Sequence, residues 1–465
     1  MNARFLLMAF ACCASSALVA GTPPTLPLND TGIETCFDAS APIACDLATE
    51  FPRQDARFGR DPAFADGRFA KIGAGDASLD YTKIANDGSE LPADAELGAG
   101  ASEWACTRDN VTGLVWEVKT DDGGLRDKDW LYTWYYADAT DNGGDPGNTG
   151  GDTCGGTLGT ECNSDAFAAA VNAASLCGFD DWRVPQGNEL VGLVDFGVVA
   201  LAGGGTPATI DPDYFPNTIT DAAWYWTSDA LAQKLFPIFA WFVAFNDAAA
   251  NFASKDTPSA VRLVRSAPPT RMAAHAQGTL GCQEGGNGLI HPNTLGAFTV
   301  APDGTVSDSR TGLVWDQCLL GQDHANACAG PGDPYTWQQG LAAAEALNAQ
   351  NWLGHDDWRL PNVRELRSLV ERACVQPGID RNVFLNAPTD PAVLTSSTYP
   401  GFPSAMWVVG FADGGYVAQF GKNLNHRVRL VRSGDGFAAY DAVEGQGLIF
   451  ADGFDGPAVA IGEAD

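Results

Sequence analysis

The chain has 465 residues, and its 58 acidic against 27 basic side chains give a formal net charge of −31. This charge argues against nucleic acid, heparin-like polyanions and anionic membranes as main partners, and it favours divalent cations or cationic partners. Apolar residues make up 45% of the chain, which is enough to bury hydrophobic cores and excludes wholesale disorder. The length predicts two or three domains.

The first 21 residues have the pattern of a secretory signal peptide. Arg4 supplies a positive charge, residues 5–14 are apolar but too few to span a bilayer, and residues 15–21 are small. Cys12 and Cys13 leave a lipoprotein form open. Since no later apolar run is long enough for a transmembrane helix, we expect an extracellular or outer-surface location, with the periplasm as an alternative.

The cysteines that follow the signal segment are even in number, which predicts disulfide bonds in an exported chain. Three pairs lie close in sequence and are each expected to close a short loop: Cys36 with Cys45, Cys154 with Cys162, and Cys318 with Cys328. Four further cysteines must pair over a longer range, and the sequence leaves their partners open: Cys106, Cys177, Cys282 and Cys374.

Four sequence blocks occur twice in the same order, which indicates an internal repeat. The blocks are T-G-L-V-W (112–116 and 311–315), D-D-W-R-[VL]-P (180–185 and 356–361), Thr-Ser (227–228 and 395–396) and V-R-L-V-R-S (261–266 and 428–433). The chain then divides into a signal peptide (1–21), a leader (22–103), copy one (104–266), a linker (267–301), copy two (302–433) and a C-terminal tail (434–465).

Each copy is expected to begin with a strand at Leu-Val-Trp and to continue with an alanine-rich helix, at 165–176 or 337–348. A second helix follows the proline of the next block, at 363–372 in copy two. Strands at 241–245 or 407–411 and the V-R-L-V-R block form a small antiparallel sheet. The predicted fold class is α+β, with two tandem, loop-rich modules that are stapled by disulfides.

Together these blocks resemble the Lcl C-terminal domain family, which is named after the Legionella collagen-like adhesin. The resemblance covers both copies, and residues 28–58 resemble the leader of similar exported bacterial proteins. It implies a compact fold related to C-type lectins and formylglycine-generating enzymes, and an exported surface or secreted bacterial protein. Residues 447–454 resemble a short tail that ends many exported proteins of Gram-negative bacteria. The namesake domain binds sulfated polysaccharide, whereas the acidity of this chain argues against a polyanionic ligand.

We interpret the repeated Trp, Arg and Glu side chains as structural rather than as a ligand platform. In both copies the Glu follows the Arg by six positions, so the helix after the proline can return its carboxylate to the Arg. The residues of this motif are Trp116, Trp182, Arg183, Glu189, Trp315, Trp358, Arg359 and Glu365.

The aspartate-rich loop at 121–152 is a candidate calcium site, with Asp138, Asp141 and Asp145 as the expected ligands. Calcium takes about six to eight oxygen ligands from flexible acidic loops. The alternative is a solvated run of charge, because the loop has no D-x-[DN]-x-[DN]-G motif. No other cofactor is expected, and no catalytic residue is assigned, since H-E-x-x-H, G-x-S-x-G and P-loop patterns are absent from the sequence.

The first functional interpretation is an exported, non-enzymatic adhesin or glycan-binding protein whose partner is a carbohydrate or protein ligand at the cell surface. Two alternatives stay open. One is an extracellular hydrolase or oxidase that uses carboxylates between the copies. The other is a structural protein of the cell envelope.

Overall fold

The computed structural model describes residues 27–68, 70–139, 142–198, 207–221, 224–232, 236–266, 297–374, 376–387, 392–412 and 414–433. The predicted signal peptide, most of the linker and the tail lie outside these residues, as do Asp141 and Cys282. Within the described ranges, no helix has the length and apolar character needed to cross a bilayer.

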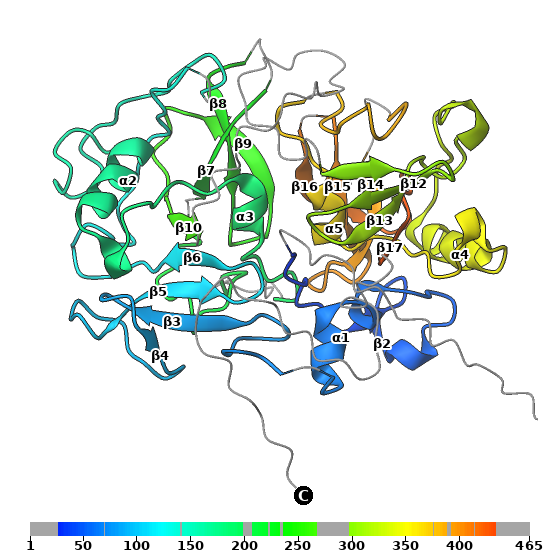
Figure 1. Ribbon diagram of the computed structural model, residues 1–465, viewed down its shortest axis with the longest axis horizontal. Coiled ribbons are helices and arrows are strands. Elements are labelled where there is room, and N and C mark those ends of the chain that lie inside the picture. Colours follow the sequence, from blue (N-terminus) through cyan, green and yellow to red (C-terminus); the bar gives the residue numbers. More distant parts are fainter. Residues whose placement is uncertain are drawn as a thin grey trace, which may run out of the picture.

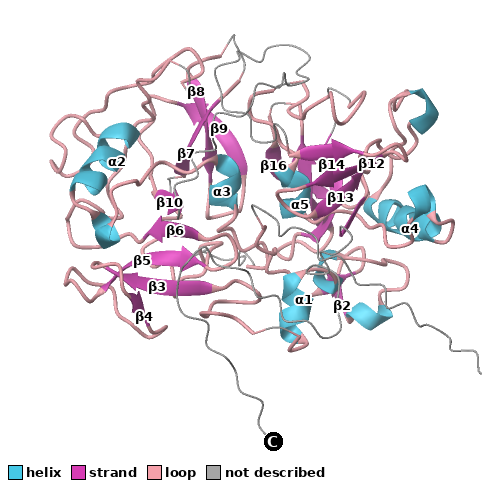
Figure 2. Ribbon diagram, in the orientation of Figure 1, coloured by secondary structure: helices cyan, strands magenta, loops and turns pink. Residues whose placement is uncertain are grey.

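The chain forms a mixed helix and sheet structure in which strands dominate (Figure 2). The leader contains β1 (Cys36–Phe37), β2 (Pro42–Ile43), η1 (Cys45–Leu47), η2 (Asp55–Arg57), α1 (Arg60–Ala65), β3 (Tyr81–Ala85) and β4 (Glu90–Leu91). Copy one contains β5 (Trp104–Asp109), β6 (Leu114–Glu117), α2 (Ser164–Ala173), η3 (Leu176–Gly178), α3 (Gly187–Val191), β7 (Tyr225–Ala230), β8 (Phe239–Val243), β9 (Ala250–Ser254) and β10 (Val264–Ser266).

β11 (Phe298–Val300) lies at the end of the predicted linker, and copy two then repeats the order of copy one with η4 added. The elements of copy two are β12 (Thr305–Asp308), β13 (Leu313–Asp316), η4 (His324–Asn326), α4 (Trp337–Asn348), η5 (Trp352–Gly354), α5 (Val363–Ser368), β14 (Ala392–Thr398), β15 (Ala405–Gly410), β16 (Tyr416–Gly421) and β17 (Val431–Ser433). Each copy therefore has the two predicted helices and a hairpin sheet.

The two copies share local contacts as well as element order. In copy one the Asn172 amide, on the last turn of α2, forms hydrogen bonds of 2.9 and 2.7 Å with the main chain of Trp182. Asn348 on α4 makes the same two bonds with Trp358, at 2.7 and 2.8 Å. The repeated Trp is thus held against the end of the preceding helix in both copies.

The copies join in one six-stranded sheet of order β14-β15-β16-β9-β8-β7 (Figure 1). Ala250 of β9 pairs with Val417 of β16 at the join. Within their own copies Ala250 pairs with Val243 and Val417 pairs with Val409, which are equivalent positions in β8 and β15. Equivalent residues therefore meet at the join, as they do across a two-fold axis.

The largest hydrophobic cluster lies at this join and includes residues from the leader and both copies, among them Ile33, Trp116, Val243, Trp315 and Trp407. β15 contributes side chains to two hydrophobic clusters, one on each of its faces. Trp407 belongs to the shared cluster, whereas its neighbours Met406 and Val408 belong to another cluster, formed by copy two and Phe51 of the leader. Successive side chains of a strand point to opposite faces, so a run that is apolar throughout is buried on both sides.

The leader divides between the two copies (Figure 1). β3 and β4 extend the sheet of copy one, whose order is β10-β6-β5-β3-β4. The earlier elements, including η2 and α1, lie beneath copy two, and η2 contacts β14. Leader residues therefore contribute to the folded core.

Two predicted elements are shorter than the sequence pattern suggested. The V-R-L-V-R block gives only the short strands β10 and β17. In copy one the main-chain N–H of Leu263 donates to the Glu117 carboxylate at 2.9 Å, so a side chain takes the place of a ladder acceptor. The helix expected to reach residue 372 ends at Ser368, and the N–H of Glu371 donates to Gly378 instead.

Candidate functional site

The Trp-Arg-Glu motif of copy two forms a buried ion pair. The guanidinium of Arg359 contacts both carboxylate oxygens of Glu365 at 2.7 Å, and the two side chains are 3% and 4% exposed. Glu365 also accepts the N–H of Asn362 at 2.8 Å, while the Asn362 side chain accepts the N–H of Glu365. The pair therefore closes a capping box at the start of α5.

The equivalent pair in copy one is more open. Arg183 contacts Glu189 at 2.8 and 2.6 Å, but the two side chains are 34% and 19% exposed. In copy two the leader provides the extra cover, because the ring of Phe58 lies 5.4 Å from the Arg359 guanidinium. The same motif is thus buried in one copy and partly exposed in the other.

A buried Lys over a Trp ring also occurs in both copies, and the sequence interpretation missed it. Lys422 Nζ lies 3.8 Å from the ring centre of Trp337 and donates to the Asp38 carbonyl at 2.8 Å. Lys255 Nζ lies 4.3 Å from the ring centre of Trp134. Burial disfavours the charged amine and lowers the pKa of Lys422 to about 7 and that of Lys255 to about 8.

A segment from outside the repeated framework covers each Lys–Trp pair. In copy two it is the leader, whose Phe51 ring stacks 5.7 Å from Trp337. In copy one it is the inserted loop at 138–163, whose Asn142 and Asp145 carbonyls accept hydrogen bonds from Lys255 at 2.8 and 2.6 Å. Each cover contains one short-range disulfide, so the two copies reach the same arrangement through unrelated segments.

The Lys–Trp pair has a signal in the sequence, in the form of a shorter repeat. Tyr-Thr-Trp occurs at 132–134 and again at 335–337, and each Lys precedes its V-R-L-V-R block by six positions. The covering segments leave no such signal, because the leader and the inserted loop have no common sequence.

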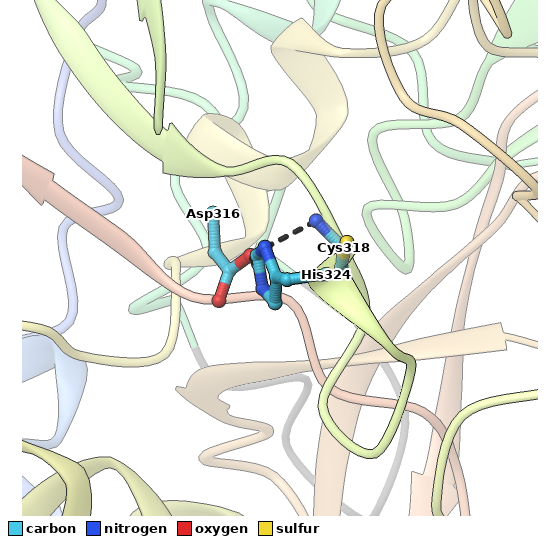
Figure 3. Close-up of side chains that lie close together, drawn as sticks. All are labelled: Asp316, Cys318 and His324. Atoms are coloured by element: carbon cyan, nitrogen blue, oxygen red, sulfur yellow. Dashed lines mark hydrogen bonds and ion pairs between the residues drawn. The ribbon is translucent and has the colours of Figure 1, made fainter. Parts of the chain in front are cut away.

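Asp316, Cys318 and His324 lie close together at the end of β13 (Figure 3), with one ligand atom of each within 4.8 Å of the others. The sulfur of Cys318 is bonded to Cys328, so it offers no thiolate to a metal. The Asp316 carboxylate contacts His324 Nε2 at 3.0 Å and accepts the Trp352 indole N–H at 2.9 Å. The hydrogen bond to Asp316 raises the pKa of His324. The arrangement is a structural Asp–His pair in the disulfide-bonded protein.

A second acidic group, Asp121, Asp127 and Asp129, lies in the predicted calcium loop. Lys128 Nζ contacts Asp121 at 3.3 Å and Asp129 at 2.9 Å. Asp127 accepts main-chain N–H groups, among them that of Gly123 at 2.6 Å. The ammonium group of Lys128 and main-chain N–H groups therefore already satisfy these carboxylates.

The three predicted calcium ligands are only partly placed. Asp138 is exposed, and Asp145 accepts the N–H of Gly147 at 2.7 Å. Asp141 lies outside the described residues. Calcium binding at this loop stays a prediction.

The structure contains the three short disulfides that the sequence predicted: Cys36–Cys45, Cys154–Cys162 and Cys318–Cys328. It also pairs Cys106 with Cys177, which the sequence left open. Cys374 is disulfide-bonded as well. The arginines of the last block pair with acids that precede the repeated Trp, Arg265 with Asp181 and Arg432 with Asp357, both at 2.6 Å.

Each copy exposes a phenylalanine at the tip of a hairpin, β7–β8 in copy one and β14–β15 in copy two. Phe236 is 49% exposed and Phe402 is 62% exposed, and each precedes a proline. Their main-chain contacts agree, because the carbonyls of Phe236 and Phe402 accept the N–H of the first residues of β8 and β15. An exposed aromatic side chain is therefore present at the same place in both copies.

Residues 105–265 and 304–432 both match the Lcl C-terminal domain, so the match covers more than half of the chain. The chain belongs to the Lcl C-terminal domain family. This confirms the resemblance seen in the repeated blocks. No curated protein and no solved structure matches the chain.

Proposed function

We propose that the chain is an exported, non-enzymatic binding protein that recognises a carbohydrate or protein ligand at the bacterial cell surface. The membership of both copies in the Lcl C-terminal domain family carries this proposal. The disulfides among the described residues support export, because such bonds persist in oxidising compartments outside the cytoplasm. The proposed route is the signal peptide at 1–21.

We further propose that each Lcl C-terminal module is a variant of the C-type-lectin-like fold. Long loops, two helices and a small hairpin sheet in each copy support this assignment. The net charge of −31 favours a neutral or cationic ligand over the sulfated polysaccharide that the namesake domain binds. Calcium remains a proposed cofactor.

The exposed hairpin tips are the proposed contact surface. Aromatic side chains are enriched at binding interfaces because each buries a large apolar area, and their rings can pack on the apolar faces of sugar rings. Phe236 and Phe402 are both exposed, and the internal repeat places them at equivalent positions. Two such tips on one rigid body would give a bivalent ligand higher avidity than a single tip.

The test is an array of bacterial and host glycans probed with the full exported chain, with calcium and again with a chelator. We expect binding that falls at least tenfold in the double variant Phe236→Ala/Phe402→Ala. Ile72→Ala is the matched control, because Ile72 is 70% exposed on the leader and lies outside both hairpins. Turnover of a labelled polysaccharide would instead favour the hydrolase alternative, and full binding by the double variant would exclude the hairpin tips.

A further inference from the structure

Three carboxyl groups of the leader are buried where it meets copy two. Asp30, Asp55 and Asp61 are 2%, 4% and 1% exposed. Within the part of the chain that the structure describes, none of the three forms an ion pair. Buried carboxylates without a cationic partner are costly, so their contacts call for an explanation.

Two of these groups bridge the leader to copy two. Asp55 accepts the Ser397 hydroxyl at 2.5 Å and the Thr31 hydroxyl at 3.0 Å. Asp30 accepts the side-chain amide of Asn362 at 3.2 Å. Ser397 lies on β14 and Asn362 caps α5. Carboxyl oxygens of the leader are therefore hydrogen-bonded to both a strand and a helix of copy two.

The remaining contacts bind the three carboxyl groups into one cluster. Asp30 accepts the main-chain N–H of Thr31 and of Asp61, each at 2.9 Å. Asp61 in turn accepts the N–H of Gly32 at 2.7 Å and the Ser78 hydroxyl at 2.5 Å. Any change in one carboxyl group is therefore felt by the other two.

Other charged groups face the cluster from the leader and from both copies. Arg364 of α5 is attracted to Asp30 and Asp61, and Glu365, paired with Arg359, repels Asp55. Glu34 and Asp195 each repel Asp61. Arg60 precedes Asp61 on α1 and is also buried. Cationic side chains therefore lie near the cluster, but Arg364 and Arg359 each interact with an acid other than these three.

We propose that this joint is a pH-responsive latch, which fastens the leader to copy two in mildly acidic solution and loosens as the pH rises. Protonation removes charge from the cluster, whereas ionised carboxylates that are buried near one another repel. Loosening would first uncover Arg359, because Phe58 of the leader lies against it.

The titration of two groups supports the direction of the latch. Burial raises the pKa of Asp55 to about 7, and the charge of Asp61 adds to this. Burial and the charges of Asp61 and Asp55 also raise the pKa of Asp30. The folded protein then binds more protons than the unfolded chain, so stability falls as the pH rises from the ordinary aspartate value of about 4 through about 7.

The test measures amide hydrogen exchange of the full exported chain between pH 5 and pH 9, with rates corrected for intrinsic chemistry. We expect at least tenfold faster opening of residues 51–65 at pH 9 than at pH 5. In Asp55→Asn, which keeps the shape of the neutral acid, this pH dependence should shrink to less than threefold. Asp66→Asn is the matched control, since Asp66 lies on the same segment and its side chain is 66% exposed.

A second measurement uses only the wild-type protein, so it does not require any variant to fold. Carbon-13 NMR of aspartate-labelled wild-type protein should show at least one carboxyl group that titrates above pH 6. If every aspartate titrates below pH 5, or if Asp55→Asn keeps the full pH dependence of leader opening, the latch is overturned.

Discussion

At the scale of single residues, burial rather than residue type separates the two copies of the motif. Arg359–Glu365 and Arg183–Glu189 have the same bidentate geometry, yet only the first is sealed from solvent. Removing one member of a buried ion pair leaves an uncompensated charge, whereas a partly exposed pair is screened by water. The same substitution should therefore have different effects in the two copies.

Arg359→Ala is expected to lower the free energy of unfolding by about 3–5 kcal/mol, because Glu365 is left buried without its partner. Arg183→Ala, the matched control, should cost on the order of 1 kcal/mol. Urea denaturation of both variants measures the difference. Equal losses would show that the leader does not seal the pair in copy two, and lost binding with unchanged stability would make the motif a ligand site.

His324 provides a pH prediction at the same scale. Its hydrogen bond to Asp316 raises the histidine pKa, so the folded protein holds this proton more tightly than the unfolded chain. The stabilisation is complete below the ordinary histidine pKa of about 6.5 and is lost as the pH rises through the higher folded value. NMR titration should show His324 titrating above 6.5, and Asp316→Asn should return it toward that value. A value at or below 6.5 in the wild type would contradict the pair.

At the scale of elements, the covering segments decide how the repeated framework is used. The leader loop closed by Cys36–Cys45 carries Asp38, whose carbonyl caps Lys422, and the insertion supplies the carbonyls that cap Lys255. A disulfide between cysteines that are close in sequence limits the conformations that the loop can adopt when it is unfolded. Each cover is thus held in place by its own crosslink rather than by the framework alone.

Replacing both Cys36 and Cys45 with Ala should lower the free energy of unfolding by about 2–3 kcal/mol. It should also raise the rate at which an amine-reactive acylating reagent modifies Lys422, read by mass spectrometry. Lys255 is the internal control, because a different loop covers it. Equal acylation of Lys422 with and without the crosslink would show that the disulfide does not hold the cover.

At the scale of the whole molecule, the copies behave as one body. Arg372 of copy two lies 3.8 Å from the ring centre of Trp241 in copy one, and its Nε lies 3.5 Å from an oxygen of Asp229. Arg364 donates to the Gly192 carbonyl at 2.6 Å, which again crosses between the copies. Together with the shared sheet and cluster, these contacts predict cooperative unfolding.

Denaturation is therefore expected to show a single transition, with the same midpoint for hydrogen exchange at α2 and at α4. Arg372→Ala should lower both midpoints together, because it removes a contact that the copies share and leaves Asp229 buried. Two separate transitions in the wild type, or a shift confined to copy two, would show that the copies unfold independently.

The sequence by itself determined what depends on nearby residues. Spacing predicted α4 with the bounds that the structure gives it, and short separations predicted three disulfides. The repeated blocks were enough to identify the family. These features follow from helix periodicity, turn chemistry and loop closure, each of which acts over about ten residues.

Only the tertiary structure decided what joins distant parts of the chain. It placed Ala250 against Val417, paired Cys106 with Cys177, and seated the leader on copy two rather than solely on the copy that follows it. These contacts depend on which apolar faces remain uncovered once each copy has folded. A single sequence records that such faces exist but not which partners meet there, because that choice follows from the shape and charge of surfaces that form only in the folded chain.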